Sequence, residues 1–145
     1  MVDSARYDVG LKVRREVMGA EAADRAMAND DSFTSAYRAM AVEWCWGQAW
    51  GSDGLQRRER SLMNLAMLTA LGKPEELKLH VKAALNNGLR MEEIREALLH
   101  ATVYCGIPAG SVAFRAAREA LTEAGKLATV AGGGDTVAAL NAAGV

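Results

Sequence analysis

The chain has only two histidines, so few of its side chains can exchange a proton near neutral pH. Glu76 lies four residues before His80, which places the two side chains on one face of a helix. A carboxylate beside an imidazole selects one tautomer and raises the imidazole pKa, which gives a general acid or base. The alternative is a solvated pair on an exposed surface. The neighbouring Leu77 and Val81 favour partial burial of His80.

The second histidine and the two cysteines are weaker candidates. His100 has only Glu96 as a helical neighbour to pair with, and we interpret it as a surface histidine. Cys45 and Cys105 form no CxxC pair, which argues against a disulfide framework or a zinc site. Such lone cysteines are usually small buried apolar side chains. Cys105 is still a second candidate proton donor, because it follows Tyr104 directly before a predicted helix break.

Two arginines at the start of a predicted central helix are suited to bind a carboxylate. Arg57 and Arg60 are three residues apart, and a guanidinium can grip a carboxylate with two parallel hydrogen bonds. The alternative is that they are surface charges matched to Glu59 and Asp53. The sequence alone leaves both possibilities open.

A further carboxylate lies in an aromatic cluster. Glu43 directly precedes Trp44, with Trp46 and Trp50 following in the same segment. Desolvation by three indoles would raise the pKa of this carboxyl group. The alternative for each tryptophan is packing in a core or an interface.

The elements that must position these residues are predicted to be helices only. At 145 residues, half of them hydrophobic, the chain is long enough for one domain with a real core. Apolar residues recur at helical spacing, strand-like alternation is absent, and only two prolines occur. We expect a single all-α domain over residues 1–124, followed by an Ala- and Gly-rich tail over 125–145 that is mobile or wraps a neighbouring subunit. The expected helices cover about 7–18, 21–28, 32–50, 56–71, 74–87, a segment that ends at Cys105, and 108–124.

Charge and hydropathy narrow the choice of partners. Seventeen basic and eighteen acidic residues give a net charge of −1, which provides no electrostatic reason to expect nucleic acid or an acidic membrane. No apolar run is long enough to span a bilayer, and charged residues stand where a signal peptide needs an apolar segment. We therefore expect a cytoplasmic protein. The helix over 56–71 is apolar almost all round, which favours self-association to bury the excess.

Ordered motifs occur between Arg6 and about Leu121. They include Glu43-x-x-Trp46-Gly47-x-x-Trp50, Arg57-x-x-Arg60-Ser61-Leu62, Glu76-Leu77-Lys78-Leu79-His80, Ala83-x-x-Asn86-Asn87-Gly88 and Tyr104-Cys105-Gly106-Ile107-Pro108. In these motifs and their order, the sequence resembles the carboxymuconolactone decarboxylase family. The resemblance implies an all-α, carboxymuconolactone decarboxylase-like (AhpD-like) helical domain assembled as a ring-like homo-oligomer, typically a trimer or hexamer. It also implies chemistry without a cofactor: conversion of gamma-carboxymuconolactone to the beta-ketoadipate enol-lactone, in protocatechuate catabolism, with release of carbon dioxide.

The resemblance also suggests roles for individual residues. In the expected reaction, Arg57 and Arg60 hold a carboxylate, and His80, oriented by Glu76, delivers a proton to carbon. His80 or the backbone N–H groups after Pro108 stabilise the developing oxyanion. Hydrophobic side chains exclude water. The catalytic candidates are His80, Glu76 and Cys105, and the substrate-binding candidates are Arg57, Arg60, Glu43, Trp44, Trp46, Tyr104 and Ile107. We expect no metal and no organic cofactor.

One difference from peroxidase-like relatives bears on the mechanism, and two departures from the decarboxylases bear on the substrate. Peroxidase-like relatives carry a CxxC pair where this chain has Lys73 and Glu76, which excludes a dithiol mechanism. Ser52-Asp53 replaces an Arg-Pro pair, and Trp44 replaces a His or Tyr. The sequence therefore leaves three hypotheses: the lactone decarboxylase, an enzyme of the same fold that decarboxylates or isomerises another small lactone or keto acid, and a non-catalytic oligomeric protein that binds small molecules.

Overall fold

In the computed structural model, residues 3–28 and 31–128 are described, and helices are the only regular elements among them. The all-α prediction is therefore confirmed for this part of the chain. The predicted tail falls largely on residues 129–145, which lie outside the described residues. In chain order the elements are α1 (Ser4–Met18), α2 (Ala20–Ala28), α3 (Ser35–Met40), the π-helix η1 (Ala41–Trp50), α4 (Arg57–Ala70), α5 (Pro74–Asn86), α6 (Met91–Cys105) and α7 (Ile107–Glu123).

Local sequence signals explain where most of these helices begin and end. Asp3 caps α1 by accepting hydrogen bonds from the backbone N–H groups of Ala5 and Arg6, so the helix starts earlier than predicted. Gly19 ends α1 with φ 88°, and Gly106 separates α6 from α7 with φ 92°, a region that glycine enters without steric cost. Pro74 occupies the first turn of α5, where its missing N–H leaves no helical bond unmade.

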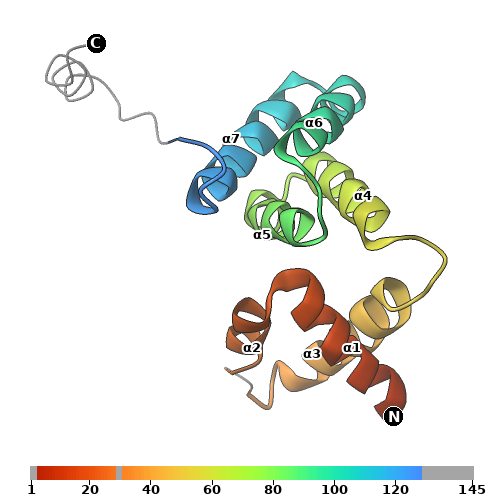
Figure 1. Cartoon of the computed structure of the whole chain (residues 1–145). Coiled ribbons are helices and arrows are strands. Elements are labelled where there is room, and N and C mark those ends of the chain that lie inside the picture. The colour runs from red at the N-terminus through yellow and green to blue at the C-terminus, as the bar shows by residue number, and fades with distance from the viewer. Residues whose placement is uncertain (1–2, 29–30, 129–145) are drawn as a thin grey trace, which may run out of the picture.

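The helices form two groups that meet at α5 (Figure 1). In the first group α4, α5, α6 and α7 enclose a core of large apolar side chains, which includes Leu65, Leu77, Ile94 and Leu98. In the second, α1 packs along η1 through a smaller core of Val13, Val17, Trp46 and Trp50, which Ala83 of α5 completes. The Asn86 side chain also donates a hydrogen bond to the Val17 carbonyl oxygen, 3.2 Å away, and ties α5 to the end of α1.

The predicted helix that ends at Trp50 is two elements rather than one. A short α-helix, α3, continues into the ten-residue π-helix η1. Runs of π-helix this long are rare, and π-helical turns often mark functional sites. Two glycines let α1 and η1 touch backbone to backbone, because a Cβ at Gly10 would overlap the Val42 carbonyl and one at Gly47 would overlap the Arg6 carbonyl.

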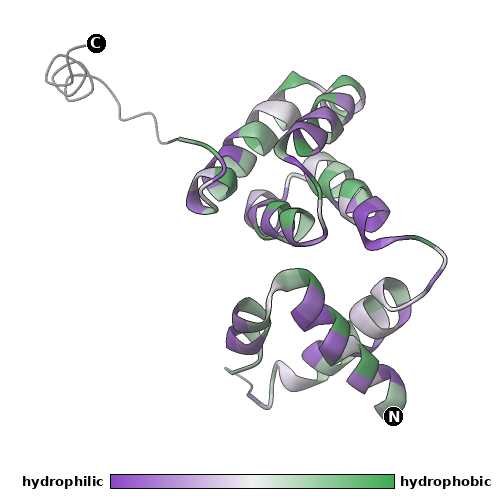
Figure 2. Cartoon of the chain, in the orientation of Figure 1, coloured by the Kyte–Doolittle hydropathy of each residue, from purple (hydrophilic) through white to green (hydrophobic). Residues whose placement is uncertain are grey.

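Only one side of α4 is buried within the chain. Leu65 is inaccessible to solvent, whereas Leu62, Met63 and Met67 are exposed. Figure 2 shows the polar first turn of α4 followed by a mainly apolar remainder. The core of one chain therefore covers only one face of this helix, and its other apolar side chains stay exposed. Among the residues that the structure describes, no helix has the length and apolar character needed to cross a membrane.

Candidate active site at the junction of the two helix groups

His80 lies where the two helix groups meet. It projects from α5 and is half-buried. Its ring stacks against Trp50 at the end of η1, with ring centroids 6.3 Å apart and an angle of 23° between the planes. The side-chain amide nitrogen of Asn64, on α4, is 3.3 Å from His80 Nδ1. Three separate elements therefore fix the imidazole, which is the kind of preorganisation that a catalytic group requires.

Burial lowers the pKa of His80, and the charge of Glu76 opposes this effect only in part. The sequence-based expectation of a raised pKa is therefore wrong, because desolvation of the half-buried imidazolium outweighs one carboxylate in water. The imidazole is mostly neutral at pH 7. Since the Asn64 amide nitrogen can only donate, Nδ1 accepts and Nε2 carries the proton. Nε2–H is thus the group that His80 offers to a ligand.

Glu76 acts on His80 through its charge rather than through contact. The carboxylate is exposed on α5, and within the described chain it makes no hydrogen bond to the imidazole. Asn64, not Glu76, is therefore the partner that selects the tautomer. A catalytic role for Glu76 stays a prediction.

Arg60 lies one helical turn before Asn64 on α4, so the two side chains share a face. Its Nη2 donates hydrogen bonds to Ser52, 3.1 Å to the backbone carbonyl oxygen and 2.7 Å to the hydroxyl oxygen. The Nε atom of Arg60 is buried and has no hydrogen-bond partner. A buried donor without a partner is costly, and a ligand oxygen would satisfy it. Ser52, one of the departures from the family pattern, is thus the residue that holds this arginine.

Arg57, the other arginine predicted to bind a carboxylate, lines a cavity that does not include His80. The cavity is about 490 Å³ in volume, and its walls include Trp50, Ser52, Arg57 and Arg58. Of these walls, Trp50 also stacks against His80. Arg57 forms an ion pair with Glu16 of α1 rather than with Glu59 or Asp53.

Arg58 pairs with Glu93 at 2.6 Å and donates to the Gly88 carbonyl. Both cavity arginines are therefore already neutralised. Arg60, which has a donor to spare, is the better candidate to bind a substrate carboxylate.

The aromatic cluster on η1 has mainly structural contacts. Glu43 is buried and accepts hydrogen bonds of 3.3 Å from the Arg6 guanidinium and from the Asp3 backbone N–H. The Arg6 guanidinium also lies 4.8 Å from the centre of the exposed Trp44 ring. Trp46 is buried, with its ring centroid 5.6 Å from that of Trp50. These contacts fix the start of α1 on η1, and substrate binding by Glu43, Trp44 and Trp46 stays a prediction.

The segment at the α6–α7 junction is exposed. Tyr104, Cys105 and Ile107 all present large accessible areas, and Figure 1 shows this junction well separated from η1. The Tyr104 ring packs against His100 with ring centroids 4.9 Å apart and an angle of 42° between the planes, and in the described part of the chain it makes no ring contact with His80 or Trp50. Within one chain the structure therefore does not bring this segment to His80. The proposed roles of Tyr104, Cys105 and Ile107 stay predictions.

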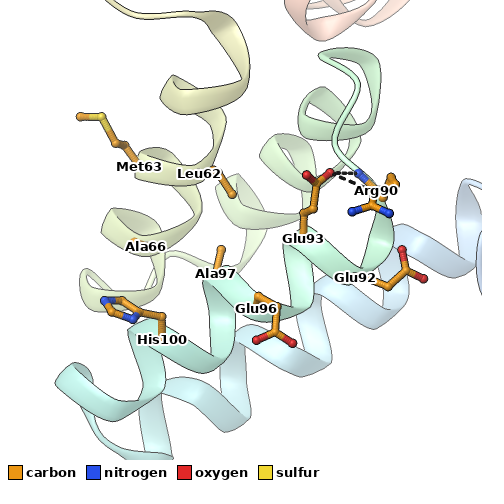
Figure 3. A pocket seen from close by; sticks show the side chains of 9 residues that line it. All are labelled: Leu62, Met63, Ala66, Arg90, Glu92, Glu93, Glu96, Ala97 and His100. Atoms are coloured by element: carbon orange, nitrogen blue, oxygen red, sulfur yellow. Dashed lines mark hydrogen bonds and ion pairs between the residues drawn. The ribbon is translucent and has the colours of Figure 1, made fainter.

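A pocket between α4 and α6 contains the other histidine. It is about 580 Å³ in volume, with Leu62, Met63 and Ala66 on one side and His100 on the other (Figure 3). Three carboxylates from α6 and one arginine also line it, namely Glu92, Glu93, Glu96 and Arg90, and Arg90 pairs with Glu93. This negative charge repels an anionic substrate. The interpretation of His100 as a surface histidine agrees with its exposure.

Asn64 and Trp50 are the residues that the sequence did not single out for the site. Asn64 is the only polar side chain in the run from Leu62 to Leu68. A lone amide in an apolar run was therefore the available signal. Trp50 stood in the recognised aromatic cluster, but only the packing of η1 against α5 shows that it contacts the imidazole. Within the described residues, no group of three or more His, Cys, Asp or Glu side chains is placed to hold a metal ion.

Comparison with known proteins places the chain in a family. The sequence pattern of the carboxymuconolactone decarboxylase family matches residues 35–119, more than half of the chain. A 4-carboxymuconolactone decarboxylase of Acinetobacter baylyi is 38% identical over 125 residues, which cover 86% of this chain and 93% of that protein. The nitrosuccinic acid decarboxylase npaB of Metarhizium robertsii is 44% identical over 102 residues, which cover 70% of this chain and 71% of that protein. The chain therefore belongs to the carboxymuconolactone decarboxylase family, and it is a decarboxylase of that family.

Proposed function

We propose that the chain decarboxylates gamma-carboxymuconolactone to the beta-ketoadipate enol-lactone, without a cofactor, at the cluster of His80, Asn64, Trp50 and Arg60. The observation that carries this proposal is the contact of a neutral His80, whose tautomer Asn64 fixes, with two other helices. Arg60, whose buried Nε has no partner, lies one helical turn from Asn64. The similarity to the Acinetobacter decarboxylase supports the same substrate. The reaction belongs to the protocatechuate branch of aromatic catabolism.

The substrate supplies its own electron sink. When the bond to the departing carboxylate breaks, the electron pair passes through the ring double bond to the lactone carbonyl, which becomes a dienolate. Carbon dioxide leaves and the ring carbon takes up one proton, so one proton is consumed in each turnover. The protein must bind the remaining carboxylate, stabilise the dienolate oxygen and supply the proton.

Arg60 would bind the remaining carboxylate through its guanidinium, with Ser52 holding Nη2. His80 would donate Nε2–H to the dienolate oxygen. A neutral imidazole suits this role, because a preorganised hydrogen-bond donor stabilises the oxyanion without itself losing the proton. The ring carbon would take its proton from a solvent water at the site, because the neutral imidazole keeps Nε2–H on the dienolate oxygen while Nδ1 accepts from Asn64.

A second candidate substrate is another dicarboxylic acid with its own electron sink. The identity to a nitrosuccinic acid decarboxylase favours it, as does Ser52-Asp53 in place of the Arg-Pro pair. In nitrosuccinate, the carbon that loses the carboxylate also carries the nitro group. The nitro group can therefore accept the electron pair, as the lactone carbonyl does in the first substrate. The same His80 donor would then serve a nitronate oxygen.

Two further parts of the proposal concern the whole molecule. We infer a homo-oligomer, a trimer or a hexamer, because exposed apolar side chains on α4, α6 and α7 would be buried by association. A cytoplasmic location stays a prediction from the sequence. A non-catalytic binding protein would be favoured if Glu76 and His80 were both fully exposed; Glu76 is exposed, whereas His80 is half-buried and held on two sides.

The test is a direct turnover assay on purified protein. Gamma-carboxymuconolactone generated in situ and nitrosuccinate would be supplied separately, with release of carbon dioxide followed. We expect turnover of the lactone, abolished or reduced by at least about 100-fold in His80→Ala. His100→Ala is the matched control, because it removes the other histidine from an exposed site, and it should keep wild-type activity. Full activity in His80→Ala would refute the proposed site, and turnover of nitrosuccinate alone would assign the second substrate.

A further inference from the structure

A second cavity lies between α6 and α7, outside the His80 cluster. It is about 730 Å³ in volume, within the range of small-molecule sites. Its floor consists of core side chains, among them Ile94, Leu98 and Leu121, which are buried. Phe114 and Leu127 add partly buried apolar walls. The floor therefore offers a dry, apolar surface to a ligand.

The polar side chains around this cavity are all positively charged. Arg95, Arg115 and Arg118 line it, and no acidic residue does. Arg115 and Arg118 are exposed on α7, three residues apart on one face, and in the described part of the chain neither forms a hydrogen bond or an ion pair. Arg95 has only the adjacent Glu96, at 3.4 Å.

The acidic residues of α7 do not neutralise these arginines. Glu119 pairs with Lys78 and Glu123 with Lys82, so both carboxylates are directed at α5. Two neighbouring cations without a counter-charge repel each other and destabilise the helix slightly. An anion bound between the two guanidinium groups would attract both of them and offset their repulsion.

We propose that the α6/α7 cavity is a second ligand site, which binds a carboxylate with an apolar body, such as a medium-chain fatty acid. The carboxylate would lie between Arg115 and Arg118, where guanidinium groups can hold it by paired hydrogen bonds. The apolar body would cover Phe114, Leu98 and Leu127. The site goes beyond the proposed decarboxylation, because it uses no residue of the His80 cluster and selects a ligand with a long apolar body rather than a small dicarboxylate.

The experiment is calorimetric titration of the full-length protein with octanoate and with octylammonium, which share a body and differ in charge. We expect octanoate to bind and octylammonium not to bind. The Arg115→Gln/Arg118→Gln variant should bind octanoate at least about tenfold more weakly, because two charge-assisted hydrogen bonds are lost. Arg25→Gln, an exposed arginine paired with Glu21 on α2, is the control and should bind as wild type does.

Three results would overturn the proposal. One is no binding of octanoate to the wild type, and another is equal binding to the double variant. The third is a change of molecular mass in the double variant, measured by light scattering, which would assign the cavity to contact between subunits. Circular dichroism of the double variant verifies that it is folded, and its decarboxylase activity should equal that of the wild type.

Discussion

At the residue scale, the central feature is an imidazole whose charge state is set by burial. Because the folded-state pKa of His80 is lowered from its ordinary value of 6.5, the neutral form predominates at pH 7. The neutral form is also the one that offers Nε2–H while Nδ1 accepts from Asn64. The lowered pKa therefore favours the neutral imidazole, and the hydrogen bond from Asn64 selects its Nε2–H tautomer.

This agreement predicts a pH profile. We expect kcat/KM to rise with pH, with a midpoint below pH 6.5, and to be constant at higher pH. The reason is that protonation of His80 removes the acceptor on Nδ1 and breaks the contact with Asn64. A profile from pH 4.5 to 8.5 at constant ionic strength measures it. A kcat/KM that falls as pH rises from 6 to 7 would instead mean that the imidazolium is the active form.

The same shift makes a prediction for stability, with the sign fixed by linkage. Between the lowered folded pKa and 6.5 the unfolded chain binds more protons at His80 than the folded chain does. The free energy of unfolding therefore decreases as pH falls from 6.5 through that window. Above pH 6.5 the neutral His80 has no such destabilising effect. Urea unfolding at several pH values should show a smaller dependence in His80→Phe than in the wild type. An equal pH dependence of stability in the two proteins would mean that the imidazole is solvated in the folded chain.

Asn64 is predicted to act as a positioning residue. Asn64→Leu keeps a similar volume but removes the hydrogen bond to Nδ1, so both tautomers become populated. We expect kcat to fall by about 10- to 100-fold, part of the 10²–10⁴-fold that a positioned acid–base group contributes, with KM little changed. Asn64→Asp should shift the pH profile upward instead, because a carboxylate stabilises the imidazolium. A purely structural role would lower thermal stability without moving the profile.

At the element scale, the α1–η1 contact is the unusual feature of the fold. A Cβ on Gly47 would overlap the Arg6 carbonyl of α1, so the helices must separate to admit one. We expect Gly47→Ala to lower the free energy of unfolding by about 1–3 kcal/mol, the range for overpacking. Gly54→Ala is the matched control, because no atom lies within 4 Å of its Cβ position. Equal stability of the two variants, measured by urea unfolding, would contradict the close contact.

The element boundaries show what the sequence can and cannot predict. Gly19, Pro74 and Gly106 act through local backbone geometry, so the breaks that they cause were predictable. The π-helix was not, because its hydrogen-bond pattern depends on how Trp46 and Trp50 pack against α1. The contact of Asn64 with His80 likewise depends on the packing of α4 against α5. The direction of the His80 pKa shift depends on how deeply that packing buries it, which sequence spacing does not specify.

At the scale of the whole molecule, the exposed apolar side chains are the feature that one chain does not explain. Leu62, Met63 and Met67 come from α4, and Val103 and Tyr104 come from α6. Scattered apolar residues on a surface need no explanation, but several on adjacent helices indicate an interface. The polar interactions near them, such as the Arg90–Glu93 pair, lie beside the apolar side chains, as at the edge of an interface.

Association through α4 can be tested at two methionines one turn apart. Met63 and Met67 are 49% and 47% exposed, so charged side chains at these positions should not disturb the core of one chain. In an interface, each buried methionine is worth about 1.5–3 kcal/mol. Met63→Glu/Met67→Glu should therefore weaken self-association by at least about 100-fold and reduce the mass measured by light scattering at micromolar concentration. Lys12→Glu, an exposed change on α1, is the control and should leave the mass unchanged. A wild-type protein that is a monomer would refute association, and an unchanged oligomer in the double variant would place the interface on other helices.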